Sequence, residues 1–246
     1  MTDFLRFTLY APLASWGDTA VGEIRGSWDR PSRSAMLGMI AAALGITRDD
    51  DPAHAALDAS LAFGVRLLAP GQALIDYHTT QNPKAGFVKK RKPRTRRDAL
   101  ADPDLPTALS RRWLRQDALV LCAIWTRTGA SYQLGDIATA IRQPVFVLYA
   151  GRKANALGLP LAPSMVAADS LAAVLADDPE LPGDLRALRP PGGWGLEVAH
   201  DPCEHFDAGL DASRVIVRRD ASPVRSRWQF AERPVNVGHV PRASGS

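Results

Sequence analysis

Hydrophobic and polar positions alternate near the start of the chain. Between residues 4 and 10, the apolar Leu5, Phe7 and Leu9 are separated by single residues of more polar character. A period of two is typical of a strand with one buried face, because successive side chains point to opposite sides of a sheet. The pattern predicts a half-buried first strand.

The period changes to that of a helix after residue 30. Pro31 favours a first helical turn, Ser32 or Ser34 can cap it, and Gly45 is suited to end it. In between, apolar residues recur three and four positions apart, as on the buried face of a helix. These residues are Met36, Leu37, Ile40, Ala41 and Leu44.

Similar patterns predict the remaining elements of a βαββαβ order. They are a short helix at 54–60, strands at 61–68 and 73–80, an apolar strand at 117–126, a helix at 134–141 and a strand at 145–149. This order indicates an α+β protein whose residues 1–160 form a ferredoxin-like domain, the architecture of RNA-recognition modules.

The C-terminal part, residues 161–246, is expected to hold a linker and a small β-rich region. We predict a helix at 168–176, an irregular Pro- and Gly-rich crossing at 177–195, strands at 214–219 and 224–230, and a frayed end from Arg242.

A long basic stretch interrupts the first domain. Residues 81–112 are too polar for a core and too long for a hairpin turn, so we predict a protruding thumb, inserted at about 81–115. Eight cations lie in it without an acid among them: Lys84, Lys89, Lys90, Arg91, Lys92, Arg94, Arg96 and Arg97. The net charge is +4, yet 22 basic residues face 26 acidic ones outside these eight. The basicity is therefore local and favours a polyanion such as nucleic acid, while a solvated loop without a partner is the alternative.

Two further places suit an anion. The start of the first helix has free N–H groups, and Arg25, Arg30 and Arg33 lie close to it in sequence. A Gly-Arg-Lys loop at 151–153 follows the last expected strand, where glycine lets the backbone approach a phosphate. The alternative for the first place is an ordinary capped core helix with surface arginines.

Flat side chains near these cations suit stacking on the bases of single-stranded RNA. They are Trp16, Tyr77, His78 and Trp113. Each of them is also compatible with simple packing in the core or on a hairpin.

The two cysteines argue against a zinc site. Cys122 and Cys203 lie in dissimilar contexts, and no CxxC or Cys/His spacing is present. Unpaired cysteines are typical of a reducing compartment, and no signal-like start or apolar run of membrane-spanning length occurs. We therefore expect a cytoplasmic protein without metal or cofactor and without a membrane partner.

Several motifs together resemble the CasD family of type I-E CRISPR Cascade subunits, in the RAMP superfamily. They are APLASWG (11–17), RPSRSAMLGMIAAALGITRDD (30–50), DYHTT (76–80), YAGRKANALGLPL (149–161) and QFAER (229–233). The resemblance implies a modified RNA-recognition fold with a protruding hairpin. It also implies a subunit that binds the 5′ handle of crRNA and caps the backbone filament, next to the backbone subunit CasC and the large subunit CasA. Contact with target DNA would be indirect.

The resemblance also assigns individual contacts. The thumb arginine of the family falls near Arg111, but an extra residue before Trp125 makes Arg112 nearly as good a match. Ala154-Asn155-Ala156 departs from the Ser-Cys-Pro of relatives. Combined with the basic positions above, the expected RNA-binding residues are Trp16, Arg25, Arg30, Ser32, Arg33, Ser34, Tyr77, His78, Lys89, Lys90, Arg111, Arg112, Arg152 and Lys153.

A catalytic alternative remains open at this stage. RNA cleavage without metal needs a base and an acid, roles that His78, Tyr77 and lysines can fill. No second histidine accompanies His78 locally, and type I-E systems normally use a separate subunit for cutting. We therefore expect a non-catalytic RNA-binding subunit, with a metal-independent endoribonuclease of CRISPR repeat RNA as the alternative. A scaffold that touches only protein is a third interpretation.

Overall fold

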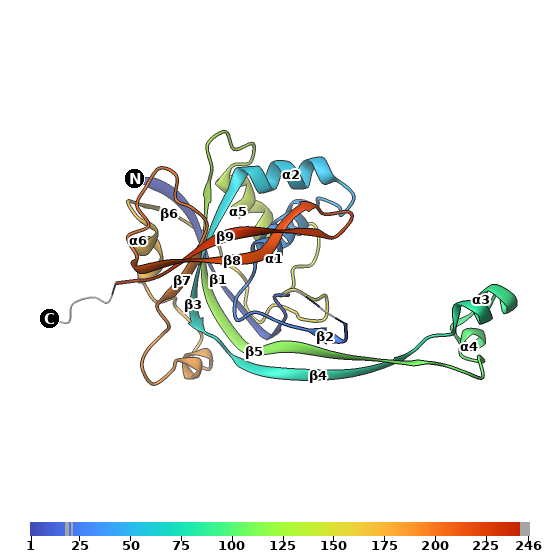
Figure 1. The fold of residues 1–246 in the computed structure, drawn as a ribbon. Coiled ribbons are helices and arrows are strands. Elements are labelled where there is room, and N and C mark those ends of the chain that lie inside the picture. The colour runs from blue at the N-terminus through green and yellow to red at the C-terminus, as the bar shows by residue number, and fades with distance from the viewer. Residues whose placement is uncertain (18–19, 21, 242–246) are drawn as a thin grey trace.

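The computed structural model describes residues 1–17, 20 and 22–241 of the protein (Figure 1). The predicted frayed end from Arg242 lies outside the described residues. The strands are β1 Thr2–Ala14, β2 Ile24–Arg25, β3 Leu61–Ala69, β4 Gln72–Gln81, β5 Thr107–Thr126, β6 Ser164–Ala168, β7 Glu197–His200, β8 Asp211–Val224 and β9 Gln229–His239. The helices are α1 Arg33–Leu44, α2 Asp51–Ser60, α3 Ala85–Arg91, α4 Arg96–Ala99, α5 Leu134–Arg142, α6 Leu171–Ala176 and the 3-10 turn η1 Leu185–Leu188.

One large sheet runs through the body in the order β6-β1-β5-β3-β7-β9-β8, and all pairs along this path are antiparallel. Two strands lie off the path, because β2 and β4 both pair with β5. The architecture confirms a mixed α and β protein. The C-terminal strands β7, β8 and β9 continue the same sheet. The predicted division into two domains near residue 160 stays a prediction.

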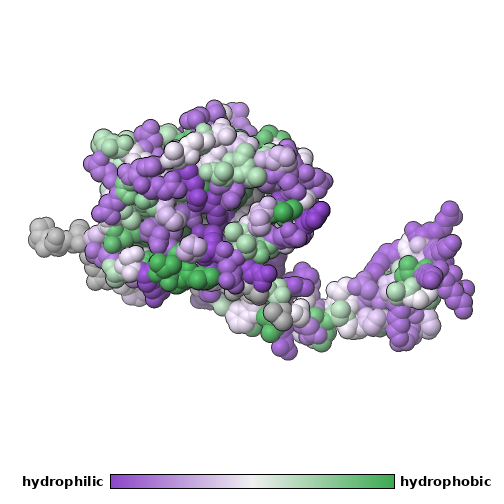
Figure 2. All heavy atoms as spheres, turned by 45° about the horizontal axis from the view of Figure 1, so that its top comes forward, coloured by the Kyte–Doolittle hydropathy of each residue, from purple (hydrophilic) through white to green (hydrophobic). Residues whose placement is uncertain are grey.

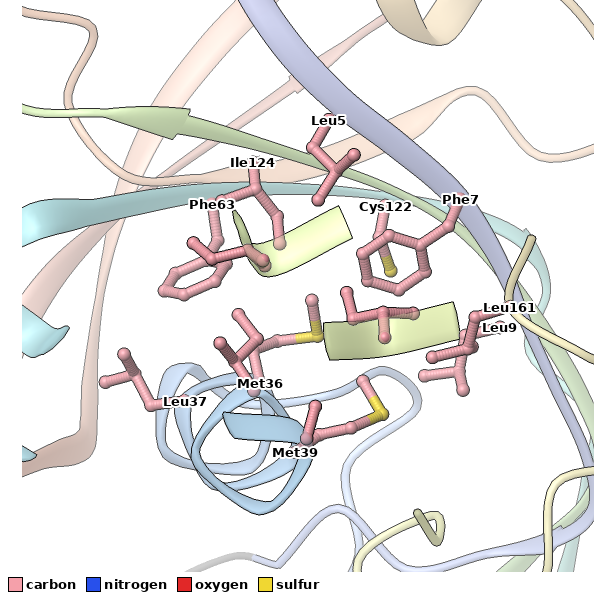
Figure 3. Close-up of a cluster of buried hydrophobic side chains, with 14 of the residues drawn as sticks. Leu5, Phe7, Leu9, Met36, Leu37, Met39, Phe63, Cys122, Ile124 and Leu161 are labelled. Atoms are coloured by element: carbon pink, nitrogen blue, oxygen red, sulfur yellow. The ribbon is translucent and has the colours of Figure 1, made fainter. Parts of the chain in front are cut away.

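Strand β1 is fully buried on one face and partly buried on the other. Leu5, Phe7 and Leu9 point toward α1 and α5 and share a core with Met36 and Met39 of α1 (Figure 3). On the opposite face, β1 contributes to a second core under α6 through residues such as Phe4 and Tyr10. The predicted alternation holds for Arg6 and Thr8, which are partly exposed, but not for Tyr10, which is buried. Alternation along β1 does not reveal that the C-terminal part covers this portion of its other face.

Helix α1 begins and ends as predicted. Of the two candidate caps, Ser32 is the one used, and its Oγ accepts from the Ala35 N–H at 3.2 Å. Gly45 ends the helix with φ +78°. Residues beyond the predicted stripe, such as Met39 and Ala43, are also buried.

The predicted strand at 145–149 does not form. The N–H groups of Val145 and Phe146 instead donate to Ala43 O and Ala42 O, at 3.0 and 3.1 Å. These carbonyls belong to the last turn of α1, where no following turn of helix supplies N–H donors. The apolar segment thus completes the end of α1, and β6 takes the sheet position beside β1. The helix predicted at 168–176 is shorter, because β6 extends to Ala168 and α6 begins only at Leu171.

Strands β4 and β5 leave the body as an arm, which we define as residues 72–116 (Figure 1). Their pairing runs from Gln72↔Gln116 to Gln81↔Thr107, and α3 and α4 lie at the far end. β5 begins ten residues before the predicted start at 117. The early part of β5 was missed because both faces of the arm are largely exposed, so its sequence lacks the alternation that burial imposes.

Candidate RNA-binding interface

The base of the arm brings three separate parts of the chain together. β5 lies between β2 and β4 at this point, with Arg25↔Arg112 paired on one side and Asp76↔Arg112 on the other. Arg25, Arg112, Gly151 and Arg152 line a groove of about 330 Å³. We call this the arm-base groove.

The three arginines of the arm-base groove are not engaged by hydrogen bonds or ion pairs of the described part of the chain. Within the described residues, the guanidinium groups of Arg25, Arg112 and Arg152 donate no hydrogen bond and make no ion pair. Partial burial lowers the pKa of Arg152, and the nearby Arg112 charge lowers it further, while Asp76 opposes the shift. Two like charges held close together in a partly desolvated groove favour an anion from outside the chain.

A tight loop at 150–155 holds Arg152 in place. Gly151 has φ +85°, and a Cβ on it would lie 1.7 Å from Ser15 O at the end of β1. The buried Asn155 closes the loop, because its Nδ2 donates to Ala150 O at 3.2 Å and its N–H to Arg152 O at 2.8 Å. Sequence reasoning treated Asn155 as a departure from the family and missed this role. Lys153 is exposed on the same loop.

The residues predicted at the arm base lie on two faces of the ribbon. Tyr77 and Arg111 are cross-strand partners, whereas Asp76 pairs with Arg112. Because side chains alternate along a strand, Tyr77 and Arg111 share one face, and Arg112 and His78 share the other. Arg112, not Arg111, therefore lines the arm-base groove.

His78 has a carboxylate partner. Its Nε2 lies 2.7 Å from Asp76 Oδ2, and both side chains are partly exposed. Tyr77 is 55% exposed on the opposite face, next to Trp113 at 36%. Two flat side chains thus stand free on the arm surface, as base stacking requires.

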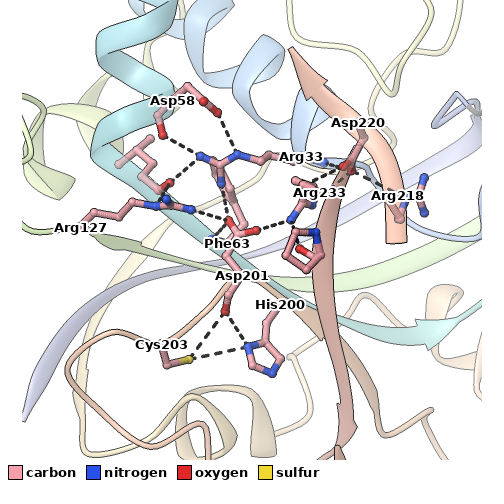
Figure 4. Close-up of polar contacts among 12 residues, drawn as sticks. Arg33, Asp58, Phe63, Arg127, His200, Asp201, Cys203, Arg218, Asp220 and Arg233 are labelled. Atoms are coloured by element: carbon pink, nitrogen blue, oxygen red, sulfur yellow. Dashed lines mark hydrogen bonds and ion pairs between the residues drawn. The ribbon is translucent and has the colours of Figure 1, made fainter. Parts of the chain in front are cut away.

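Arg33 lies inside the protein (Figure 4). Its Nε donates to Asp58 Oδ1 at 2.8 Å, its Nη2 donates to Leu61 O at 2.9 Å, and its Nη1 donates to Asp201. Arg233 of β9 donates to the other oxygen of Asp201 at 2.6 Å. The side chain therefore joins α1 to α2 and β3 and, through Asp201 and Arg233, to the C-terminal hairpin formed by β8 and β9.

The start of α1 already contacts an anion of the chain itself. The Arg33 N–H donates to Asp220 Oδ2 of β8 at 2.8 Å, and Arg233 Nε donates to Asp220 Oδ1 at 2.6 Å. Asp220 is 4% exposed. The C-terminal hairpin thus occupies this N–H group, and the prediction that Arg33 binds RNA stays a prediction.

Arg30 is engaged in a similar way. Its Nε and Nη2 donate to the two Asp29 oxygens at 2.9 and 3.0 Å, and Nη2 also donates to Glu197 of β7. Burial alone would raise the pKa of Asp29, but the hydrogen bond and the charge of Arg30, together with the charge of Arg115, outweigh it and the pKa is lowered. Arg30 is therefore a buried structural cation in this conformation.

Trp16, Ser32 and Ser34 border a second hollow, of about 1130 Å³, between the helix start and the C-terminal hairpin. Trp16 is only 5% exposed and packs in the core, and Ser32 is occupied as the cap of α1. Two aromatic residues of the hairpin, Trp228 and Phe230, line the same hollow and were missed from the sequence. Lys89 and Lys90 are exposed at the far end of the arm, away from both places.

A family model described as CRISPR-associated protein (Cas_Cas5) matches residues 4–236. The chain belongs to this family of CRISPR-associated proteins. The resemblance found in the motifs is also confirmed by a curated relative, "CRISPR system Cascade subunit CasD" of Escherichia coli (strain K12). That protein is 28% identical over 172 residues, which cover 65% of this chain and 70% of CasD.

Two solved structures share the fold of this Cas5-family chain. One is titled "CRISPR RNA-guided surveillance complex", with TM-score 0.65, 24% identity and coverage of 98% of this chain and 92% of that one. The other is titled "Crystal structure of Cas protein", with TM-score 0.56, 23% identity and coverage of 97% and 95%. At these identities, the likeness establishes the fold.

Neither a membrane-crossing helix nor a metal-binding cluster occurs among the described residues. No helix in this part of the Cas5-family chain has the length and apolar character to cross a membrane. Over the same residues, no group of three or more His, Cys, Asp and Glu is placed to hold a metal ion.

Proposed function

We propose that this chain is a non-catalytic RNA-binding subunit of a type I-E Cascade surveillance complex in antiviral defence. It binds and shapes the 5′ handle of the crRNA and caps the backbone filament. Its partners are the crRNA, the backbone subunit CasC and the large subunit CasA, and target DNA is reached indirectly. The similarity to CasD over 70% of that subunit supports this assignment, and the free thiols of Cys122 and Cys203 are compatible with work in the cytoplasm.

The observation that carries the proposal is the arm-base groove. Arg25, Arg112 and Arg152 converge there from three segments, and none of them makes a side-chain hydrogen bond or an ion pair with a described residue. Guanidinium groups bind phosphate through charge-assisted hydrogen bonds, so an RNA backbone is a fitting occupant. Tyr77 and Trp113, exposed on the other face of the ribbon, offer stacking surfaces for bases as the strand passes the arm.

The strand order supports a ferredoxin-like interpretation of the body. The order β6-β1-β5-β3, with α1 and α5 on one face, corresponds to the fourth, first, third and second strands of a βαββαβ unit. The arm then interrupts the connection between the second and third strands, where a thumb was expected. We propose that it serves as the thumb of this subunit.

Replacing all three groove arginines by glutamine tests the proposal. Removing one phosphate-binding cation lowers the salt dependence of single-strand binding by about 0.7, so the slope of log affinity against log salt should become less steep by about 2. The measurement is binding of the full chain to single-stranded RNA with the handle sequence, over a salt series. Retention of crRNA by the co-expressed complex is the second readout.

Exposed arginines elsewhere provide the control. Arg214, Arg219 and Arg227 lie on the C-terminal hairpin, and replacing them by glutamine removes the same charge. This control should keep the salt slope of the wild type. If both triple variants bind the handle RNA equally well, the arm-base groove is not the RNA site.

The pairing of His78 with Asp76 favours the alternative, a metal-independent endoribonuclease. Such a pair can accept the proton of a ribose 2′-hydroxyl. Tyr77, the other candidate group, lies on the opposite face of β4 and does not reach the same atom. Incubation of the purified chain with CRISPR repeat RNA and EDTA decides the question, since cleavage that His78→Ala abolishes would establish the enzyme, and intact RNA would exclude it.

A further inference from the structure

The end of the arm carries cations that the rest of the chain does not compensate. We define the arm tip as residues 82–106, which hold α3 and α4 and contain eight cations and three acids. Lys84 and Arg96 are engaged within the arm, by Asp104 and by Gln81 O. The other six are exposed and make no side-chain hydrogen bond or ion pair with any described residue. They are Lys89, Lys90, Arg91, Lys92, Arg94 and Arg97.

The acids of the arm tip are used to build it. Asp98 forms a capping box with Thr95 at the start of α4. Asp102 is buried and accepts from the Lys84 and Asp104 N–H groups at 3.0 and 3.1 Å. These contacts fix the tip, so its free cations are displayed on a folded knob rather than on a loose loop.

The shape and composition of the tip differ from those of a single-strand site. The knob is convex, stands at the end of the ribbon and is covered mostly by hydrophilic side chains (Figures 1 and 2). Phe87 is the one aromatic residue between 82 and 106, and it is half-buried. Sites for single strands combine a groove with exposed stacking surfaces, whereas duplexes are held largely through their phosphates.

The spacing of charge also matches a duplex. α3 has seven residues and is therefore about 10 Å long. Along that length a DNA duplex presents about six phosphate charges, while one of its strands presents about three. Of the six free cations in 89–97, Lys89, Lys90 and Arg91 lie on α3 and match the three phosphates of one strand. Lys92, Arg94 and Arg97 lie on the turn after α3 and on α4, and they provide cations for the second strand of a duplex.

We propose that the arm tip binds the phosphate backbone of a double-stranded nucleic acid, as a second site separate from the arm-base groove. The inference stands on the tip alone and does not depend on which RNA segment occupies that groove. The shared chemistry is a duplex backbone, which either DNA or RNA can supply.

The test compares two variants of the full chain with equal loss of charge. The tip variant carries Lys89→Gln, Lys90→Gln, Arg94→Gln and Arg97→Gln. The control carries Arg189→Gln, Arg214→Gln, Arg219→Gln and Arg227→Gln, all of them exposed positions outside the arm. Affinities for duplex DNA, duplex RNA and single-stranded RNA of the same sequence are measured between about 50 and 200 mM salt.

Raising the salt over this range weakens duplex binding. Because the tip variant lacks four phosphate-binding cations, this loss of affinity should be about 100-fold smaller for the variant than for the wild type. The control should behave as the wild type, and single-stranded RNA binding should be equal in both variants. A larger effect on DNA than on RNA, or the reverse, identifies the natural source of the duplex. The proposal would be overturned if the tip variant and the control bound duplex equally well. It would also be overturned if the tip variant lost as much affinity for single-stranded RNA as for duplex.

Discussion

The Arg33 side chain is 4% exposed and bonds to the carboxylates of Asp58 and Asp201. Removing it leaves Asp201, itself 2% exposed, short of a cation in the interior. Breaking a buried pair from one side typically costs about 3–5 kcal/mol. Asp201 keeps Arg233 as a partner here, but the hydrogen bonds of Arg33 to Asp58 and to Leu61 O are lost as well. We therefore predict that Arg33→Met lowers the free energy of unfolding by this amount in a denaturant titration.

Arg25→Met is the matched control for this prediction. Arg25 is exposed and its side chain has no partner among the described residues, so its replacement should change stability by less than about 0.5 kcal/mol. If Arg33→Met is as mild as the control, the ion-pair network does not hold the hairpin on α1. The double variant with Asp201→Asn should lose less stability than the sum of the two single variants, because Arg33 and Asp201 belong to one ion-pair network.

His200 predicts a pH dependence of stability. It is 6% exposed, and its ring Nδ1 lies 2.7 Å from Asp201 O. Burial lowers the pKa of His200 below its usual 6.5, with the Asp201 contacts opposing the shift. The unfolded chain therefore takes up a proton near pH 6.5 that the folded chain does not, so the stabilisation is complete above this pH and is lost as the pH falls toward the folded pKa.

The loss between pH 7 and pH 5 amounts to at most about 2 kcal/mol for one such histidine. His200→Asn keeps a donor near the Nδ1 position and does not titrate. Its free energy of unfolding should fall less over this pH range than that of the wild type. Parallel pH profiles for the two proteins would show that His200 does not contribute.

These buried residues also mark a boundary of sequence reasoning. Arg30 and Arg33 were assigned to an RNA site because they flank a helix start, and their positions relative to that helix are as expected. Their partners Glu197, Asp201 and Asp220 come from more than 160 residues away. No local pattern predicts such a contact, so the difference between a surface cation and a buried one could not be read from the sequence.

At the scale of single elements, the loop at 150–155 decides where Arg152 lies. Gly151 combines φ +85° with a close approach to Ser15 O, so neither the backbone nor the space tolerates a Cβ. We predict that Gly151→Ala destabilises the protein by more than about 1 kcal/mol and shifts the loop away from β1. RNA affinity should fall as well, because Arg152 moves with the loop.

Gly135 is the control for this substitution. It lies in α5, and a Cβ there would meet no atom within 4 Å. Gly135→Ala should therefore stabilise the protein by about 0.5–1 kcal/mol and leave RNA binding unchanged. Thermal unfolding and RNA titration of both variants check the two expectations, and equal RNA affinities would separate the loop from binding.

An element could be predicted where its burial produces a local pattern in the sequence. α1 has a capping serine, a terminal glycine and an apolar stripe, and all three signals are local. β3 was found because eight of its nine residues, all except Arg66, are apolar and because it ends at a turn. The segment at 145–149 has the composition of a strand, yet its N–H groups serve the end of α1. Tertiary structure decides which group receives these hydrogen bonds, and the strand propensity of the segment does not predict the outcome.

At the scale of the whole molecule, the chain separates a body with two cores from an arm that lacks one. Sequence reasoning found this division because charge and polarity rise sharply in the stretch after residue 81. It did not find how far the ribbon continues, since exposed strands carry no periodic burial. The groove at the arm base depends on β2, β5 and the loop at 150–155 meeting, which only the fold establishes.

The arm tip should be dispensable for folding of the body. Gln81 and Thr107 are the last cross-strand pair of the ribbon, so a two-residue Asn-Gly turn can replace residues 82–106 between them. The free energy of unfolding should not fall, and the shorter connection could raise it by up to about 2 kcal/mol. Cooperative unfolding in a denaturant titration checks this expectation.

The same tipless protein separates the two proposed sites. It keeps Arg25, Arg112 and Arg152, so its affinity for handle RNA should stay close to that of the wild type, while its affinity for duplex should drop as in the tip variant. A tipless protein that unfolds more easily would mean that the tip supports the body. One that binds neither handle RNA nor duplex would mean that groove and tip act as a single site, because removing one of two independent sites leaves the other intact.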